Sequence, residues 1–268
     1  MPLFFWALTL TPQPNPWRGL AVFVIFHGLL YPASNGYNSA IDQDTEAIGG
    51  LAHPPAPPAL LAPLTAVMDA LALGWGLYLN PYFGLGIGFL ILMSRLYSAP
   101  WPRLKQYPIL SFVLVSSLQG YFTFSCLYVG LHHLLLPDQD PVVIGAALTS
   151  TLLVGAAYPL SQIFQHAADA KRGDFTLSRQ LGYQGTFVFS EVLLLMALGT
   201  CYLSQPLKHS LLFSICMLPA WLYLLFWHWQ VYKDTAKANF THSFRLNILW
   251  ALGLNTCFLW LFLDALLA

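Results

Sequence analysis

The feature that most constrains this chain is a succession of long apolar segments joined by short polar links. A transmembrane helix needs about 20 consecutive apolar residues, and only 8% of the 268 residues are charged, too few to cover a soluble fold of this size. The sequence therefore predicts an all-α, polytopic integral membrane bundle of eight to nine transmembrane helices. Eight segments approach or exceed the required length: residues 17–34, 59–79, 81–97, 108–136, 141–164, 183–204, 207–229 and 244–267.

A ninth apolar segment, Pro2–Leu10, precedes these eight and is too short to cross a bilayer. It is either a half-span, an interfacial segment, or a first helix that is short or truncated. The links between the apolar segments are too short to separate two soluble domains. We therefore expect a single transmembrane domain over residues 1–268.

The charged residues indicate how the bundle is oriented. Eleven basic residues balance eleven acidic ones, so the basic excess typical of a nucleic-acid-binding protein is missing and we expect no such partner. Two basic residues, Arg18 and Lys208, belong to one set of alternate loops, and nine belong to the other set or to the helix ends beside it. The positive-inside rule places the larger set in the cytoplasm. That set is Arg95, Arg103, Lys105, Lys171, Arg172, Arg179, Lys233, Lys237 and Arg245.

Two segments on the predicted cytoplasmic side share one polar pattern. Tyr31–Asp42 and Tyr158–Asp169 both read Y-P-x-S-[NQ]-x-[YF]-[NQ]-x-A-x-D, and each ends an apolar helix. The two helices are four apart in order, and an even separation preserves the direction of crossing. The pattern predicts two related helical halves whose polar ends face a shared cavity.

Helical spacing predicts that the polar side chains of each repeat form a stripe, because residues i and i+4 lie on one helix face. Helix caps and solvated loop residues are the alternative for either segment taken alone. Carboxylate and amide oxygens suit Mg²⁺ that keeps water ligands and bridges to phosphate oxygens. The first stripe is Asn38, Asp42 and Glu46, with Asn35 about one turn earlier, and the second is Gln165 and Asp169, with Gln162 about one turn earlier.

A basic segment on the same side, Tyr97–Lys105, lies between the two repeats. Arg103 can bind phosphate oxygens through its forked guanidinium and Lys105 as a point charge. The alternative is that both residues only set the orientation of the bundle. A second basic segment, Lys171–Gly182, follows directly after Asp169.

Taken in order, these motifs resemble those of the UbiA superfamily of intramembrane prenyltransferases. The family's first motif, NxxxDxxxD, is matched by Asn38, Asp42 and Glu46. Two positions depart from the family pattern: Glu46 replaces the last aspartate of the first motif, and Gln165 replaces the first aspartate of the second. Because Gln165 removes one charge, a second Mg²⁺ is expected to be held more weakly. The second motif, DxxxDxxxG with TL and LG, is matched by Gln165, Asp169, Gly173, Thr176, Leu177, Leu181 and Gly182, and the YSxPPxRxK-like loop by Tyr97, Ser98, Pro100, Arg103 and Lys105.

The resemblance implies a helical bundle around a central cavity that opens to membrane lipid and is capped on the cytoplasmic side of a prokaryotic inner membrane. It implies transfer of a prenyl group from a polyprenyl diphosphate to a lipophilic acceptor, aromatic or a quinone precursor, with Mg²⁺ as cofactor. The catalytic residues would be Asp42, Asp169, Arg103 and Lys105, and the metal ligands Asn38, Asp42, Glu46 and Asp169. Substrate binding would involve Asn35, Asn38, Tyr97, Gln162, Gln165, Lys171 and Arg172.

Other residues of the polar helix ends and spans are weaker candidates. Tyr37, Phe164 and Tyr97 are candidates to stabilise a carbocation through their aromatic faces, with helix packing an equal alternative. Glu191, inside an apolar span, is expected to line the cavity or to bond a neighbouring helix.

Three alternative functions stay open. An isoprenoid cyclase of the same fold would use the same ionisation step. A non-catalytic isoprenoid-binding relative would explain the loss of charge at Gln165. A secondary transporter would also contain repeats, but its polar helix breaks should lie near the bilayer midplane rather than at one face.

Overall fold

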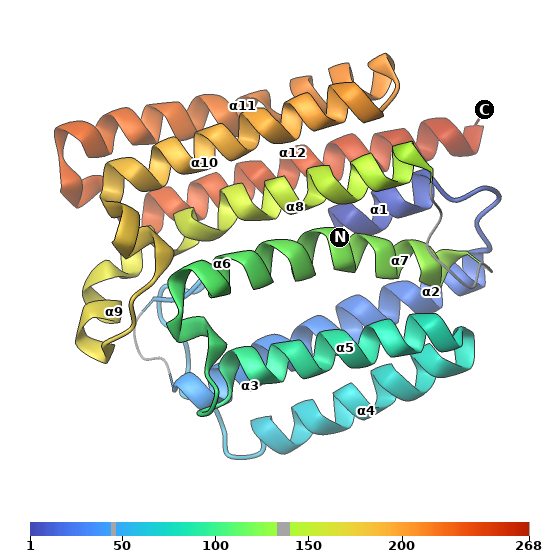
Figure 1. Ribbon diagram of the computed structural model, residues 1–268, viewed down its shortest axis with the longest axis horizontal. Helices are drawn as coiled ribbons and strands as arrows, with labels where there is room; N and C mark the ends of the chain where they lie inside the picture. The colour runs from blue at the N-terminus through green and yellow to red at the C-terminus, as the bar shows by residue number, and fades with distance from the viewer. Residues whose placement is uncertain (44–46, 133–139, 268) are drawn as a thin grey trace.

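The computed structural model describes residues 1–43, 47–132 and 140–267, and within them it is a bundle of helices (Figure 1). An isolated bridge between Ile48 and Leu51 is the only β-type pairing in this part of the chain. The predicted all-helical class is therefore confirmed. In chain order the α-helices are α1 (Pro2–Thr9), α2 (Pro16–Val24), α3 (Tyr31–Asp42), α4 (Leu61–Leu79), α5 (Pro81–Ser98), α6 (Pro108–Ser116), α7 (Thr123–Leu131), α8 (Pro141–Gln162), α9 (His166–Arg172), α10 (Leu177–Ser204), α11 (Leu207–Lys233) and α12 (Phe240–Leu267).

Several of these helices join into longer ones. Six-residue π-helical turns connect α2 to α3 at Ile25–Leu30 and α6 to α7 at Ser117–Phe122. A 3₁₀ turn at Ile163–Gln165 connects α8 to α9. Seven segments of the described chain are long and apolar enough to cross a membrane: Pro16–Asp42, Leu61–Leu79, Pro108–Leu131, Pro141–Ala170, Leu177–Ser204, Leu207–Lys233 and Phe240–Leu267. The chain is an integral membrane protein.

The remaining predicted span, residues 81–97, corresponds to helix α5, which has 18 residues. It follows α4 after a sharp turn at Asn80, whose side-chain oxygen accepts hydrogen bonds from the backbone nitrogens of Tyr82 and Phe83. This side-chain cap satisfies amide groups that the first turn of a helix leaves without partners. The α4–α5 hairpin packs against α3.

The short N-terminal segment forms a helix inside the bundle. Trp6 of α1 is 1% exposed, and its ring stacks on Phe258 of α12 at a centroid distance of 4.4 Å. Phe124 of α7 meets the same indole edge-on at 5.6 Å. The segment Pro2–Leu10 is therefore helical over Pro2–Thr9 and held inside the bundle by aromatic packing; the choice among the three readings stays open.

Close approach of α8 to the α6–α7 helix depends on one glycine. A Cβ atom added to Gly120 would lie 2.3 Å from the Cα of Thr151, so any larger residue forces these backbones apart. The π-helical turn at this position frees backbone groups, and the Tyr121 amide donates to Thr151 Oγ1 at 2.9 Å. In lipid such groups need a partner inside the protein, so the contact stabilises the irregular turn.

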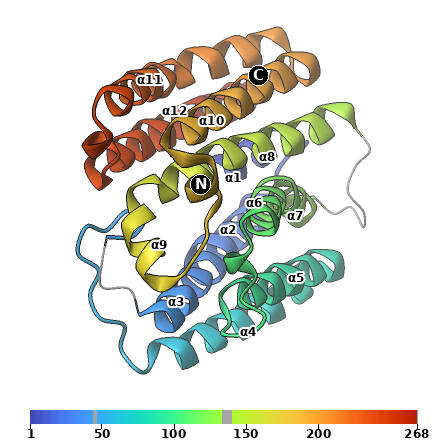
Figure 2. The same cartoon turned by 60° about the vertical axis from the view of Figure 1, so that its left-hand side comes forward.

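The two sets of basic residues separate to opposite ends of the bundle, as predicted. One end, at the left in Figure 1, contains the end of α3, the α5–α6 link, α9 and the α11–α12 turn. Figure 2 brings this end forward and shows α9 beside the end of α3. We call it the polar end. Arg18 of α2 and Lys208 of α11 begin helices at the opposite end. The relation between two helical halves stays a prediction.

Candidate active site

The first predicted motif lies at the end of α3. Asn38 Oδ1 accepts hydrogen bonds from Ser98 Oγ at 2.7 Å and from Lys105 Nζ at 3.2 Å. Asp42 is the last residue of α3, because Gln43 adopts a left-handed conformation with φ of 51°, and that conformation ends a right-handed helix. The structure therefore corrects the predicted stripe: it stops at Asp42, and Glu46 lies outside the described residues.

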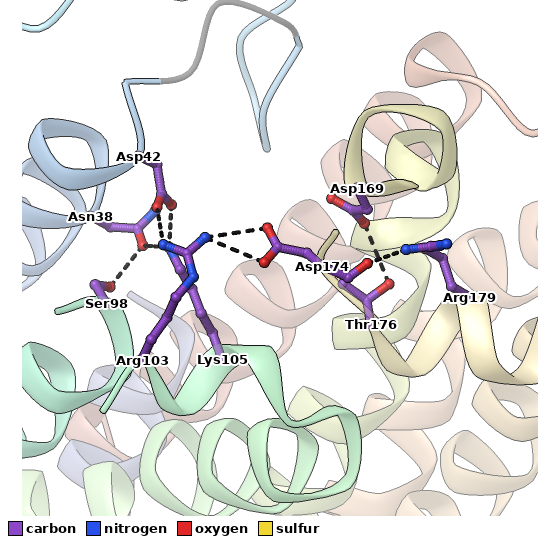
Figure 3. Close-up of polar contacts among 9 residues, drawn as sticks. All are labelled: Asn38, Asp42, Ser98, Arg103, Lys105, Asp169, Asp174, Thr176 and Arg179. Carbon is purple, nitrogen blue, oxygen red and sulfur yellow. Dashed lines mark hydrogen bonds and ion pairs between the residues drawn. The ribbon is translucent and has the colours of Figure 1, made fainter. Parts of the chain in front are cut away.

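Two cations from the α5–α6 link contact Asp42 (Figure 3). Lys105 Nζ donates to Asp42 Oδ2, and Arg103 Nη1 lies 3.6 Å from Asp42 Oδ1. Burial lowers the pKa of Lys105, and the hydrogen bond to Asp42 opposes that shift. The structure thus brings three predicted site residues into one ion-paired cluster.

The second predicted motif approaches this cluster from α9. Asp169 is 3% exposed, and its Oδ2 lies 3.4 Å from Thr176 Oγ1, which donates a hydrogen bond. The Asp169 carbonyl accepts from the backbone nitrogen of Asp174 at 2.9 Å. This turn directs the Asp174 side chain toward Arg103, whose Nη2 lies 3.3 Å from both carboxylate oxygens. Arg103 thereby connects the two motifs, as Figure 3 shows.

The second stripe is also discontinuous. The 3₁₀ turn at Ile163–Gln165 interrupts the helix between Gln162 and Asp169. Gln165 Nε2 donates to the Ala47 carbonyl at 3.2 Å, and Gln162 Oε1 accepts from the Ser178 backbone nitrogen at 3.3 Å. Each amide therefore tethers a neighbouring backbone segment, and a substrate contact of either stays a prediction.

Three hydroxyl groups from α5, α6 and α8 form one hydrogen-bonded group. The hydroxyls of Tyr97 on α5 and Tyr158 on α8 lie 2.9 Å apart, and Ser111 Oγ of α6 lies 2.6 Å from Tyr158 and 3.3 Å from Tyr97. Tyr97 was a predicted site residue. Tyr158 was missed as one, although it opens the second repeat. Ser111 and Asp174 belong to none of the motif positions recognised in the sequence, so nothing there marked them as site residues.

A partly open cavity of about 410 Å³ has Tyr158 in its wall. This volume lies in the range typical of small-molecule sites. Its lining residues come from the N-terminal segment, α3, the α6–α7 helix, α8 and α12: Met1, Pro2, Leu3, Tyr31, Val115, Gln119, Ser150, Leu153, Val154, Ala157, Tyr158, Ser161, Asn247, Trp250 and Leu254.

The remaining predicted substrate-binding residues lie around the polar end. Asn35 is exposed on α3, one turn before Asn38. Lys171 and Arg172 are the last two residues of α9, and the structure describes only their backbone. Their roles stay predictions.

The weaker candidates are engaged elsewhere. The Tyr37 ring lies 4.0 Å from the Arg95 guanidinium carbon, and Phe164 packs edge-on against Phe240 at 5.5 Å. Glu191 Oε1 lies 2.8 Å from His228 Nδ1 on α11, so it bonds a neighbouring helix. These contacts pack the three side chains against neighbouring elements, and a role of Tyr37 or Phe164 in stabilising a carbocation stays a prediction.

The carboxylates of the polar end suit a Mg²⁺ ion that is held by few protein ligands and keeps water or phosphate oxygens in its shell. Within the described chain there is no group of three or more His, Cys, Asp or Glu side chains placed to hold a metal ion by themselves. Mg²⁺ commonly binds through one or two carboxylates and completes its shell with water and phosphate oxygens. Asp42 Oδ1 is buried and has no hydrogen-bond partner among the described residues. Arg103 Nη1 lies 3.6 Å from this oxygen as an ion-pair partner, and a carboxylate oxygen that accepts no hydrogen bond suits such an ion.

Comparisons with known proteins agree with this architecture. The UbiA prenyltransferase family matches residues 1–262. A structure described for digeranylgeranylglyceryl phosphate synthase in membranes is 16% identical with a TM-score of 0.64, covering 100% of this chain and 92% of that one. A UbiA homologue from Archaeoglobus fulgidus bound to Cd²⁺ is also 16% identical with a TM-score of 0.64, covering 96% of this chain and 93% of that one. Curated protein sequences yield no significant match.

The two structures share the fold, and the family match spans almost the whole chain. The chain therefore belongs to the UbiA prenyltransferase family and is an intramembrane prenyltransferase.

Proposed function

We propose that the polar end binds a polyprenyl diphosphate through Mg²⁺ and that the prenyl group is transferred to a lipophilic acceptor, aromatic or a quinone precursor, in the cavity below. The observation that carries this proposal is the bridge from Asp42 through Arg103 to Asp174. It joins the two acidic motifs. Tyr158 in the cavity wall bonds Tyr97, and Ser98, the next residue, bonds Asn38 of the first motif.

In the reaction, the bond between the prenyl C1 atom and the diphosphate oxygen breaks, and its electron pair leaves with the diphosphate. A bond forms between C1 and the acceptor, which releases a proton. Negative charge therefore grows on the diphosphate in the transition state. Side chains placed where this charge develops lower the barrier most, because they bind the transition state better than the substrate.

The ion pairs of the structure supply such groups. Arg103 and Lys105 would exchange their carboxylate partners for phosphate oxygens as the diphosphate binds. Asp42 and Asp169 would hold Mg²⁺, with Asn38 and Glu46 as further predicted ligands. When bound, Mg²⁺ supplies neutralising charge to the leaving group.

The cavity suits the apolar part of the reaction. Its walls are mainly apolar and aromatic side chains of membrane-spanning helices, which would hold the isoprenoid tail and exclude water from the cation that forms at C1. Further contacts to the diphosphate are proposed for Asn35, Gln162, Gln165, Lys171 and Arg172, and to the reacting end of the tail for Tyr97.

We also propose that the polar end faces the cytoplasm of a prokaryotic inner membrane. Nine basic residues at or near that end support this orientation, because positive loops are retained on the cytoplasmic side.

The proposal is tested by following the consumption of labelled geranylgeranyl diphosphate by the purified protein with Mg²⁺ and a panel of lipophilic aromatic and quinol acceptors, with and without a chelator. Asp42→Asn and Asp169→Asn are expected to lower turnover about 100-fold or more, the loss typical when one group that stabilises transition-state charge is removed. Asp264→Asn is the matched control, because Asp264, near the end of α12, pairs with Lys208 at the start of α11, away from the polar end. Turnover that survives chelation, or that is unchanged in both variants, would refute the metal assignment.

A further inference from the structure

Asp174 lies where the two acidic motifs meet, although it occupies none of the motif positions. It directly follows Gly173, which has a left-handed conformation with φ of 75° at the end of α9. The backbone nitrogens of Gly173 and Asp174 donate to the carbonyls of Ala170 and Asp169, at 3.3 and 2.9 Å. This pair of hydrogen bonds is the Schellman motif, a common way of ending a helix. The backbone of Asp174 is therefore fixed by the fold.

Arg103 is constrained on the other side of this junction. Its φ of 49° places it in the left-handed conformation, which residues other than glycine rarely adopt. Such conformations persist where the surrounding structure imposes them, and they cluster at ligand-binding sites. The Arg103 carbonyl also accepts a hydrogen bond from the Gln106 backbone nitrogen at 3.0 Å. Two constrained backbone segments thus bring the Arg103 guanidinium and the Asp174 carboxylate together, as Figure 3 shows.

The contact between these side chains uses N–H groups that a phosphate would also use. Arg103 Nη2 lies 3.3 Å from both carboxylate oxygens of Asp174, and Nη1 lies 3.6 Å from Asp42 Oδ1. Both terminal nitrogens of the guanidinium therefore face a carboxylate. Carboxylate and phosphate oxygens are alternative acceptors for the same guanidinium N–H groups. Asp174 thus occupies a place on Arg103 that a phosphate oxygen would need.

The ion pair is weak enough to be exchanged for a ligand. Hydrogen bonds between a cationic N–H group and a carboxylate are usually about 2.7–2.9 Å long, and both distances from Arg103 to Asp174 are longer. The Arg103 and Asp174 side chains are 27% and 19% exposed, so water screens their attraction. A ligand with several phosphate oxygens can therefore displace Asp174, and its affinity is reduced by the loss of that ion pair.

The charge of Asp174 acts differently on free diphosphate and on its Mg²⁺ complex. A diphosphate bound to Arg103 would lie close to the displaced Asp174 carboxylate, and like charges repel. Free diphosphate carries more negative charge than its Mg²⁺ complex, so the repulsion is stronger for the free form. Lys105 does not offset this repulsion in the empty site, because it is paired with Asp42.

We propose that Asp174 is a specificity-determining residue, which competes with the diphosphate for Arg103 and thereby favours the Mg²⁺ complex over free diphosphate. This inference rests on the proposed function, because it takes the polar end as the diphosphate site. It gives Asp174 an effect opposite in sign to that of Asp42 and Asp169. Removal of either of their charges weakens diphosphate binding, whereas removal of the Asp174 charge strengthens it.

The test is equilibrium binding of the unreactive thiolo analogue of geranylgeranyl diphosphate to the purified full-length protein, with Mg²⁺ or with a chelator. Asp174→Asn keeps the shape of the side chain and the backbone hydrogen bonds of the turn. It is expected to lower Kd about three- to tenfold with the chelator, and by a smaller factor with Mg²⁺.

Asp234→Asn is the matched control, because it removes one negative charge from the same end of the bundle without touching the cluster. Asp234 is exposed in the α11–α12 turn, where its Oδ1 accepts from the Ala236 backbone nitrogen at 3.0 Å. Asparagine retains an acceptor at that position. The Kd of this variant is expected to stay within about twofold of the parent value under both conditions.

A second comparison separates competition for Arg103 from general repulsion. In an Arg103→Gln background, Asp174→Asn is expected to lose most of its effect, because the contested guanidinium is gone. The inference would be overturned by an unchanged or higher Kd in Asp174→Asn with the chelator, an equal change in Asp234→Asn, a gain as large with Mg²⁺, or an equal gain in the Arg103→Gln background. Each of these results leaves the proposed function intact. Failure of the parent protein to bind the analogue with Mg²⁺ would overturn both.

Discussion

An ion pair between α4 and α5 holds the helix that carries the first motif, and breaking it should loosen the site. Arg95 Nε donates to Asp69 Oδ2 at 2.8 Å, and Arg95 Nη1 donates to Thr65 Oγ1 at 3.1 Å. The same guanidinium lies over the Tyr37 ring of α3. A single side chain thus ties three helices together at the polar end.

The neighbouring residues of α5 extend this contact along α3. Ser94 Oγ lies 2.6 Å from Ser34 Oγ, and Ser98 Oγ donates to Asn38 Oδ1. With Arg95 on Tyr37, α5 contacts α3 at three places over little more than one turn. Because α5 also leads into the link that carries Arg103 and Lys105, its position fixes both sides of the ion-paired cluster.

Asp69→Asn keeps the shape of the side chain but removes its charge and leaves Arg95 uncompensated. Loss of one partner of a fully buried pair costs about 3–5 kcal/mol. The Arg95 and Asp69 side chains are 22% and 12% exposed, which lowers the expected cost to about 2 kcal/mol. For a chain of this size that corresponds to a fall in Tm of about 4–8 °C. We also expect a higher KM for the prenyl diphosphate. Arg95 would no longer be fixed over Tyr37, so α3, which carries Asn38 and Asp42, would be held less firmly.

The assay is thermal unfolding of the detergent-purified protein followed by tryptophan fluorescence, together with steady-state kinetics. Asp264→Asn serves as control, because it breaks an exposed pair with Lys208 that contributes about 1 kcal/mol or less. The double variant Asp69→Leu, Arg95→Met removes both charges and should recover part of the lost stability. If Asp69→Asn changed Tm and KM no more than the control does, the Asp69–Arg95 ion pair would have no role in holding α3 in place.

Three further changes test separate parts of the structure. Gly120→Ala places a Cβ 2.3 Å from Thr151 Cα and should lower stability by about 1–3 kcal/mol; an unchanged Tm would contradict the close contact. Tyr158→Phe removes the hydroxyl bonded to Tyr97 and should reduce kcat/KM for the prenyl diphosphate several-fold, and an unaltered value would exclude that hydroxyl from the site. Gln165→Asp restores a carboxylate and should not raise the Mg²⁺ concentration needed for half-maximal turnover; a clear rise would assign the amide a different role.

Hydropathy predicted the membrane helices well, because each span must be apolar over most of its length. It located α4 and α5 to within a few residues and placed Arg18 and Lys208 opposite the other basic residues. It left Pro2–Leu10 undecided, because the segment is positioned by the stacking of Trp6 on Phe258 and by its edge-on contact with Phe124. Those contacts join residues that are far apart in the sequence.

Helical periodicity was less reliable at the site. Four-residue spacing predicted one stripe through Asp42 to Glu46, but the left-handed Gln43 ends the helix, and glutamine carries no strong signal for that conformation. The bridge from Arg103 to Asp174 arises where a link and a turn meet. Contacts between a link and a turn that are distant in sequence depend on how whole helices pack, and local sequence patterns do not encode that packing.

The central claim is that both acidic motifs hold one diphosphate. Binding of the unreactive thiolo analogue of geranylgeranyl diphosphate, measured with and without Mg²⁺ in Asp42→Asn, Asp169→Asn and the double variant, tests it most directly. The account predicts binding that depends on Mg²⁺ and a Kd at least about tenfold higher in each single variant. It also predicts that the double variant loses much less binding free energy than the sum of the two single losses, because residues that hold the same ligand are not energetically independent. Additive effects, or Mg²⁺-dependent binding that either variant leaves unchanged, would contradict it.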